Sequence, residues 1–188
     1  MNETRTIFFI GRPGCGKGTQ AKTLGQHTGW PVFGSGAQFR AISEEDTIVG
    51  RKVKGEIDEG ILSPPWFAMY LYQKALFSIP ENQNAIFDGF NRKVPEAELV
   101  VDSLKWLGRS FQVIELLISD EEALRRIDLR KEEQHRADDA FVPERLKEYN
   151  KFTKDAIEIF RKEGVLIEVD GERPPEVIAA DIRQLLSV

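Results

Sequence analysis

Residues 11–20 read GRPGCGKGTQ, a glycine-rich run around a single lysine. Gly11, Gly16 and Lys17 have the spacing G-x-x-x-x-G-K, which is typical of loops that bind phosphate. Glycines allow backbone N–H groups to curl around phosphate oxygens, and a helix that starts at the lysine directs its positive end toward them. Lys17 would reach the outer phosphates, and the Thr19 hydroxyl could bind magnesium or an inner phosphate. The run therefore predicts a loop that holds a nucleotide.

Other side chains suit the transfer of a phosphoryl group. Such a reaction requires positioning and positive charge around the moving group more than covalent chemistry. Asp88 ends the apolar run AIFD, where a carboxylate could hold magnesium directly or through water. The chain has two histidines and offers no evident pair of nucleophile and general base. An ionised phosphate that attacks another phosphate needs neither.

The composition is that of a single globular domain. The chain has 188 residues, of which 41% are hydrophobic and 30% charged, enough for one substantial core. A net charge of −5 provides no general basic field for nucleic acid or an anionic membrane. The single cysteine excludes an internal disulfide, and the apolar run at 7–10 is too short for a signal peptide or membrane span. We expect a cytoplasmic, largely monomeric protein.

Alternating apolar and amphipathic segments predict the elements that position these residues. Strands buried on both faces are expected at 6–10, 85–90, 111–118 and 165–169, with a shorter strand at 30–33. Helices are expected at 17–27, 66–78, 95–107, 121–132, 143–162 and 174–186. This alternation predicts an α/β protein with the three-layer P-loop nucleoside triphosphate hydrolase fold, a five-stranded parallel sheet with helices on both faces. Ligands of such sheets bind beyond the carboxyl ends of the strands.

Gly18, directly after Lys17, narrows the type of phosphate loop, because the general pattern has serine or threonine there. The loop resembles that of adenylate kinases and their nucleoside monophosphate kinase relatives. The resemblance extends over nearly the whole chain, in SGAQFR at 35–40, DEGILSP at 58–64, DGFNR at 88–92, RADD at 136–139 and VDG at 169–171. It implies that ATP, with Mg²⁺, donates a phosphoryl group to a nucleoside monophosphate.

The resemblance also gives roles to the arginines, whose planar fork meets two phosphate oxygens at once. Arg40 and Arg92 would grip the acceptor phosphate, Arg126 would stack on the donor base, and the arginines of a short lid would close over the transferring group. The expected catalytic residues are Lys17, Arg92, Arg130, Arg136 and Arg145.

The two nucleotide sites follow from the same resemblance. The chain would form one kinase domain over 1–188, with an acceptor-binding insertion at about 35–64 and a short lid at about 130–136. ATP would bind Gly14, Cys15, Gly16, Lys17, Gly18, Thr19, Arg126 and Arg173. The acceptor would bind Ser35, Gly36, Phe39, Arg40, Ile61, Ser63, Gly89, Arg92 and Glu96. Magnesium would bind Thr19 and Asp88.

Several positions on the acceptor side depart from the family pattern. Glu96 stands where adenylate kinases usually read adenine with glutamine, and an ionised carboxylate accepts hydrogen bonds but cannot donate them. A base with a ring N–H fits it better. Phe39 replaces a smaller aliphatic residue, which favours a smaller ring, and Ser63 could donate to a carbonyl. Ala37 and Asn91 replace an aspartate and a proline. Together these changes favour thymine or uracil.

The acceptor stays open at this point, because Glu96 could instead face solvent. AMP and thymidylate or uridylate are equally compatible with the sequence, and GMP is a third alternative. A small-metabolite kinase would share the loop but would not need SGAQFR paired with DGFNR. A GTP-dependent switch is disfavoured, because NKFT at 150–153 lacks the aspartate of the guanine-reading pattern. A silent nucleotide-binding module would not need the lysine and the arginines.

Overall fold

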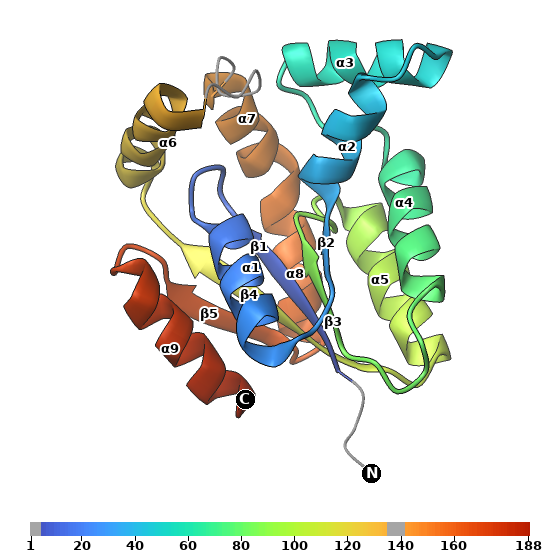
Figure 1. The fold of residues 1–188 in the computed structure, drawn as a ribbon, viewed down its shortest axis with the longest axis vertical. Helices are drawn as coiled ribbons and strands as arrows, with labels where there is room; N and C mark the ends of the chain where they lie inside the picture. The colour runs from blue at the N-terminus through green and yellow to red at the C-terminus, as the bar shows by residue number, and fades with distance from the viewer. Residues whose placement is uncertain (1–4, 135–141) are drawn as a thin grey trace.

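A parallel sheet forms the centre of the molecule in a computed structural model, which describes residues 5–134 and 142–188 (Figure 1). Its five strands lie in the order β2-β3-β1-β4-β5, and every neighbouring pair is parallel. The strands are β1 (Arg5–Gly11), β2 (Val32–Gly34), β3 (Ala85–Asp88), β4 (Ser110–Leu117) and β5 (Leu166–Asp170). The predicted fold class is confirmed.

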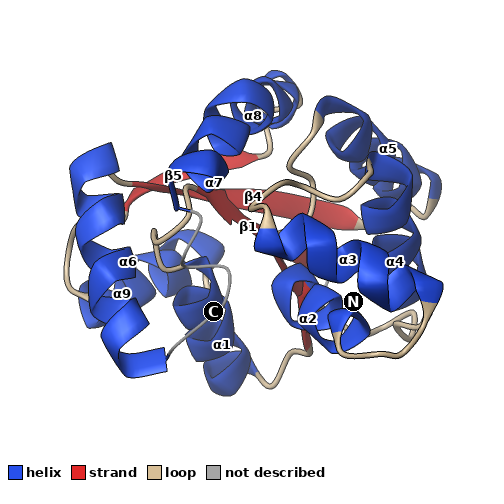
Figure 2. Ribbon diagram, turned by 90° about the horizontal axis from the view of Figure 1, so that it is seen from above, coloured by secondary structure: helices blue, strands red, loops and turns tan. Residues whose placement is uncertain are grey.

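Helices cover both faces of the sheet (Figure 2). They are α1 (Lys17–Thr28), α2 (Ser35–Ser43), α3 (Ile48–Asp58), α4 (Pro65–Phe77), α5 (Val94–Trp106), α6 (Asp120–Gln134), α7 (Val142–Glu148), α8 (Lys154–Lys162) and α9 (Pro175–Leu186), with the short π-helix η2 (Tyr149–Thr153) between α7 and α8. None of the helices in the described ranges has the length and apolarity that crossing a bilayer requires.

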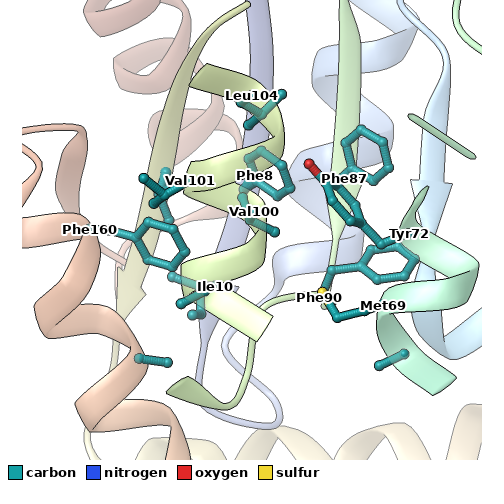
Figure 3. Close-up of a cluster of buried hydrophobic side chains, with 14 of the residues drawn as sticks. Phe8, Ile10, Met69, Tyr72, Phe87, Phe90, Val100, Val101, Leu104 and Phe160 are labelled. Atoms are coloured by element: carbon teal, nitrogen blue, oxygen red, sulfur yellow. The ribbon is translucent and has the colours of Figure 1, made fainter. Parts of the chain in front are cut away.

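Two hydrophobic clusters fix the sheet between its helices. Successive strand residues point to opposite faces, so Phe8 and Ile10 of β1 pack under α4, α5 and α8, whereas Ile7 and Phe9 pack under α1 and α9. Figure 3 shows the first cluster, in which Phe87 stacks on Phe8 with ring centroids 5.2 Å apart. The two clusters thus hold the strands that carry the functional loops between the helix layers.

The outer strands are less buried than the sequence predicted. β5 has one neighbouring strand, and within it only Val169 is buried, so the prediction of a strand buried on both faces at 165–169 is wrong. A strand at the edge of a sheet has one open side, which its composition alone does not reveal. The run at 85–90 also ends early, because Gly89 turns the chain with φ of 79°.

The insertion at 35–64 is helical, which the sequence analysis did not predict. It contains α2 and the polar helix α3, whose first turn is capped by Thr47, with the backbone N–H of Gly50 donating to the Thr47 hydroxyl at 2.8 Å. α3 packs chiefly on α2 and stands away from the sheet (Figure 1). Val49, Val53 and Ile57 have the i, i+4, i+8 spacing of a helix, so α3 carried a signal that the sequence analysis missed.

Candidate active site

A cavity of about 1210 Å³ lies where the phosphate loop, β3 and the insertion meet. Its lining includes every predicted catalytic, ATP-binding, acceptor-binding and magnesium-binding residue whose side chain the structure describes. Arg136 lies outside the described residues, and so does the side chain of Arg130. The two predicted nucleotide sites therefore open into one continuous space.

The phosphate loop holds a shape that requires glycine. Gly14 and Gly16 have φ of 83° and 96°, in the left-handed region that strains other residues. A Cβ on Gly14 would also lie 2.9 Å from the carbonyl oxygen of Ala123. Gly16 caps α1 without a side-chain hydrogen bond at that helix start. The loop thus presents backbone N–H groups and the positive end of α1 to the cavity.

Lys17 lies beneath this loop with its charge largely removed from water. Its Nζ donates to the carbonyl oxygens of Gly11 at 2.6 Å and Arg12 at 2.8 Å, and it lies 3.4 Å from Cys15 Sγ. Burial lowers the pKa of Lys17, because water no longer solvates the ammonium. An ammonium in such surroundings attracts phosphate more strongly than one in solvent does.

Asp88 at the end of β3 explains the glycine that follows Lys17. A Cβ on Gly18 would lie 3.2 Å from Asp88 Oδ2, a closer approach than most side chains tolerate. The carboxylate therefore rests against the first turn of α1, beside the phosphate loop. Gly18 leaves room for the Asp88 carboxylate beside the phosphate loop, where magnesium was predicted to bind.

This contact predicts a specific effect of enlarging Gly18. Gly18→Ala should lower kcat about tenfold, because Asp88 must shift by a few tenths of an ångström and misplacement by 1 Å can cost a hundredfold. The unfolding temperature should not fall, since alanine favours helix. Steady-state kinetics and thermal unfolding measure both quantities. His27→Ala, an exposed change on α1, should alter neither; an unchanged kcat in Gly18→Ala would contradict the role given to this contact.

The predicted acceptor side is built around Gly89. Its φ of 79° and lack of a side chain let two groups approach, since a Cβ there would lie 2.7 Å from both Arg92 Nη2 and Ser35 Oγ. The Arg92 Nε donates to the Gly89 carbonyl at 2.6 Å, which orients the guanidinium. A Cβ on Gly36 would lie 3.2 Å from Arg40 Nη1, so this arginine also folds over a glycine. Both guanidinium groups thus lie in the cavity lining, each placed against a glycine.

Glu96 lies in the first turn of α5, and its side chain caps the start of that helix. It is 3% exposed, and its Oε2 accepts from the backbone N–H of Arg92 at 2.7 Å and of Lys93 at 3.4 Å. Burial raises the pKa of this carboxyl. Glu96 therefore does not face solvent, and one of its oxygens is occupied by backbone donors.

Phe39 and Ser63 line the same region of the cavity. Phe39 packs edge-on against Phe67 with ring centroids 5.7 Å apart. Ser63 Oγ donates to Glu56 Oε2 at 2.5 Å. The Ser63 hydroxyl proton is therefore engaged within the insertion in this structure.

Three of the arginines predicted for the donor side line the cavity. Arg126 Nε donates to Glu122 Oε1 at 2.6 Å, and hydrogen bonds from Arg125 and Arg126 lower the pKa of Glu122 to about 2. Arg173 pairs with Asp181 at 2.5 Å and approaches Asp170 at 3.3 Å. Arg145 reaches the cavity from α7. The donor side thus combines arginines with acidic partners.

A polar network beneath the loop was missed by the sequence analysis. Arg12 Nε donates to Asp120 Oδ1 at 2.7 Å, and the guanidinium lies 5.2 Å from the ring centroid of Tyr149. The Tyr149 hydroxyl donates to Glu115 Oε1 at 3.3 Å, and burial raises the pKa of Glu115. None of these residues was predicted, because the sequence does not show that α6 and η2 come close to the loop.

Comparisons with known proteins agree with this geometry. A model of the adenylate kinase family matches residues 9–165. The adenylate kinase of Caulobacter sp. (strain K31) is 37% identical over 186 residues, which cover 97% of this chain and 98% of the relative. The adenylate kinase of Maricaulis maris is 36% identical, with 96% and 97% covered, and that of Cyanothece sp. is 32% identical, with 96% and 94% covered. The family resemblance predicted from the sequence is confirmed.

Proposed function

This chain belongs to the adenylate kinase family, and we propose on that basis that it transfers the γ-phosphoryl group of ATP to AMP. It is an ATP-dependent nucleoside monophosphate phosphotransferase. The observation that carries the proposal is the single cavity that joins the phosphate loop to Arg40 and Arg92. A donor on the loop and an acceptor on these arginines would meet without water between them.

The residues of the cavity suit direct transfer between two phosphates. Lys17 and the loop N–H groups would hold the outer phosphates of ATP, while Arg92 and Arg40 would hold the acceptor phosphate in line with them. Mg²⁺ binds one or two protein carboxylates beside substrate phosphates and waters, and Asp88 with Thr19 fits that requirement. When bound, the ion would neutralise charge on the phosphate oxygens. The protein itself needs no proton transfer.

The surroundings of Glu96 support AMP rather than thymidylate or uridylate as the acceptor. The preference for a base with a ring N–H rests on a Glu96 carboxylate that meets that base, and its capping contacts leave only Oε1 for this. Here Oε2 already accepts from the N–H groups of Arg92 and Lys93. The relatives that match over almost their whole length are named adenylate kinases.

A panel of acceptors tests the proposed function. Purified protein with ATP and Mg²⁺ should phosphorylate AMP with a kcat/KM at least tenfold above that for dTMP, UMP or GMP. Coupled detection of ADP gives the rates. Faster turnover of dTMP or UMP would overturn the choice of AMP, and activity with a sugar acid but no monophosphate would overturn the enzyme class.

Glu96→Gln separates base reading from capping. An amide oxygen can still accept from the Arg92 N–H, so the ratio of AMP to dTMP turnover should not change. Because the pKa of the Glu96 carboxyl is raised by folding, the folded state binds the carboxyl proton more tightly than the unfolded state does. Ionisation of Glu96 therefore lowers the free energy of unfolding as pH rises from about 4. Glu96→Gln should therefore unfold at a higher temperature than the wild type at pH 7, and the difference should vanish below about pH 4.

Glu96→Ala is the control for the cap. It removes the acceptor for both N–H groups and should cost about 1 kcal/mol of unfolding free energy, measured by urea denaturation. A shift of Glu96→Gln toward AMP would show that Glu96 reads the base after all.

A further inference from the structure

The segment that joins α3 to α4 has no regular structure, yet it forms part of the acceptor wall. Ile61, Leu62 and Ser63 line the cavity, and the segment reaches it from α3, which packs chiefly on α2. Backbone polar groups in such a stretch need partners from elsewhere. Those partners fix the position of residues 61–63 in the wall of the cavity.

Lys93 holds the carbonyl side of this segment. Its Nζ donates to the carbonyl oxygens of Leu62 at 3.2 Å and Ser63 at 3.1 Å. The same ammonium lies 5.1 Å from the ring centroid of Phe152 in η2, a cation–π contact that restricts the side chain. Lys93 itself is fixed at the N-cap of α5, next to Arg92.

Glu148 holds the amide side from the opposite direction. It is the last residue of α7, and its Oε2 accepts from the backbone N–H of Leu62 at 3.2 Å. Leu62 is therefore bound through its N–H by an anion and through its carbonyl by a cation. The two side chains come from different elements, so they fix the segment in relation to both α5 and α7.

We propose that Lys93 and Glu148 are positioning residues that set the affinity for the acceptor nucleotide by clamping residues 61–63 at the cavity wall. Neither Lys93 nor its contacts were expected from the family pattern. The inference rests on the proposed function in so far as the acceptor is a nucleoside monophosphate. It deepens that function because it makes the affinity for the acceptor depend in part on residues that would not touch phosphate.

Lys93→Met tests the clamp by removing the charge while keeping a long side chain. Hydrogen bonds to a charged group are stronger than neutral ones, and partial exposure weakens them here, so the KM for AMP should rise about tenfold. The KM for ATP and the kcat at saturating AMP should stay within about threefold. A purely structural role would instead move both KM values or the unfolding temperature.

Lys151→Met is the matched control. Its ammonium lies 4.8 Å from the same Phe152 ring, but the structure gives it no hydrogen bond to residues 61–63. It should leave both KM values unchanged. Glu148→Ala should raise the KM for AMP about as much as Lys93→Met, and Glu148→Gln should restore it, because an amide oxygen still accepts from Leu62.

Hydrogen exchange provides a readout that does not depend on activity. Amides in a peptide covering 59–63 should exchange several-fold faster in Lys93→Met and Glu148→Ala than in wild type or Lys151→Met. An unchanged KM for AMP in an active enzyme, or unchanged exchange in both variants, would overturn the clamp. A wild type that phosphorylates no monophosphate would overturn the proposed function, and exchange would still decide the clamp.

Discussion

Lys17→Met is expected to lower kcat about a thousandfold while leaving the fold intact. Removal of one preorganised charged donor from a site that stabilises developing charge costs about 10²–10³ in rate. The Lys17 ammonium is buried beneath the loop and would face the phosphates directly. Because burial lowers its pKa, the folded state disfavours the charge, and methionine should raise the unfolding temperature at pH 7.

Two measurements check this expectation. Single-turnover transfer from ATP isolates the chemical step, and thermal unfolding reports stability. Lys162→Met, on the exposed surface of α8, removes the same charge far from the cavity lining and should alter neither. A kcat within tenfold of the wild type would show that Lys17 does not serve the transferring group.

Arg92→Met should reduce kcat/KM for the acceptor about 10²–10³-fold, with little change in the KM for ATP. Loss of one partner from a desolvated charged contact costs about 2–5 kcal/mol. The effect should be strong because the guanidinium is already oriented. The Gly89 carbonyl accepts from Nε, which fixes the direction of the two Nη atoms. Arg92→Lys should recover only part of the loss, since an ammonium cannot meet two oxygens in one plane.

Initial rates over a grid of both substrates separate the two Michaelis constants. Arg51→Met is the control, because this exposed arginine pairs with Asp46 at 3.0 Å and does not line the cavity. It should leave both constants unchanged. Equal losses for ATP and for the acceptor in Arg92→Met would indicate a general distortion of the site.

The central sheet and its phosphate loop were predictable because their signals are local. The run IFFI at 7–10 is apolar without interruption and leads directly into the loop, so strand, turn and helix are specified by neighbouring residues. The position of Asp88 followed from the end of the apolar run AIFD, and that of Arg92 from the resemblance of DGFNR to the family pattern. These features could be predicted because the signals for them lie in short stretches of sequence.

The role of Glu96 was not predictable in the same way. Its family position suggested base reading, while its capping contacts depend on the backbone path of Arg92 and Lys93. Lys93 and Glu148 also meet Leu62 from distant parts of the chain. Such contacts depend on how helices dock, and no short pattern encodes that.

Cys15 is the single cysteine of the chain and is 1% exposed, with its sulfur against Lys17. A thiol reagent can therefore reach it only when the loop opens, so the rate of labelling reports how often that happens in the folded protein. A bound nucleotide should slow the labelling by holding the loop closed. The chain thus carries its own probe of fluctuations at the donor site, without any engineered label.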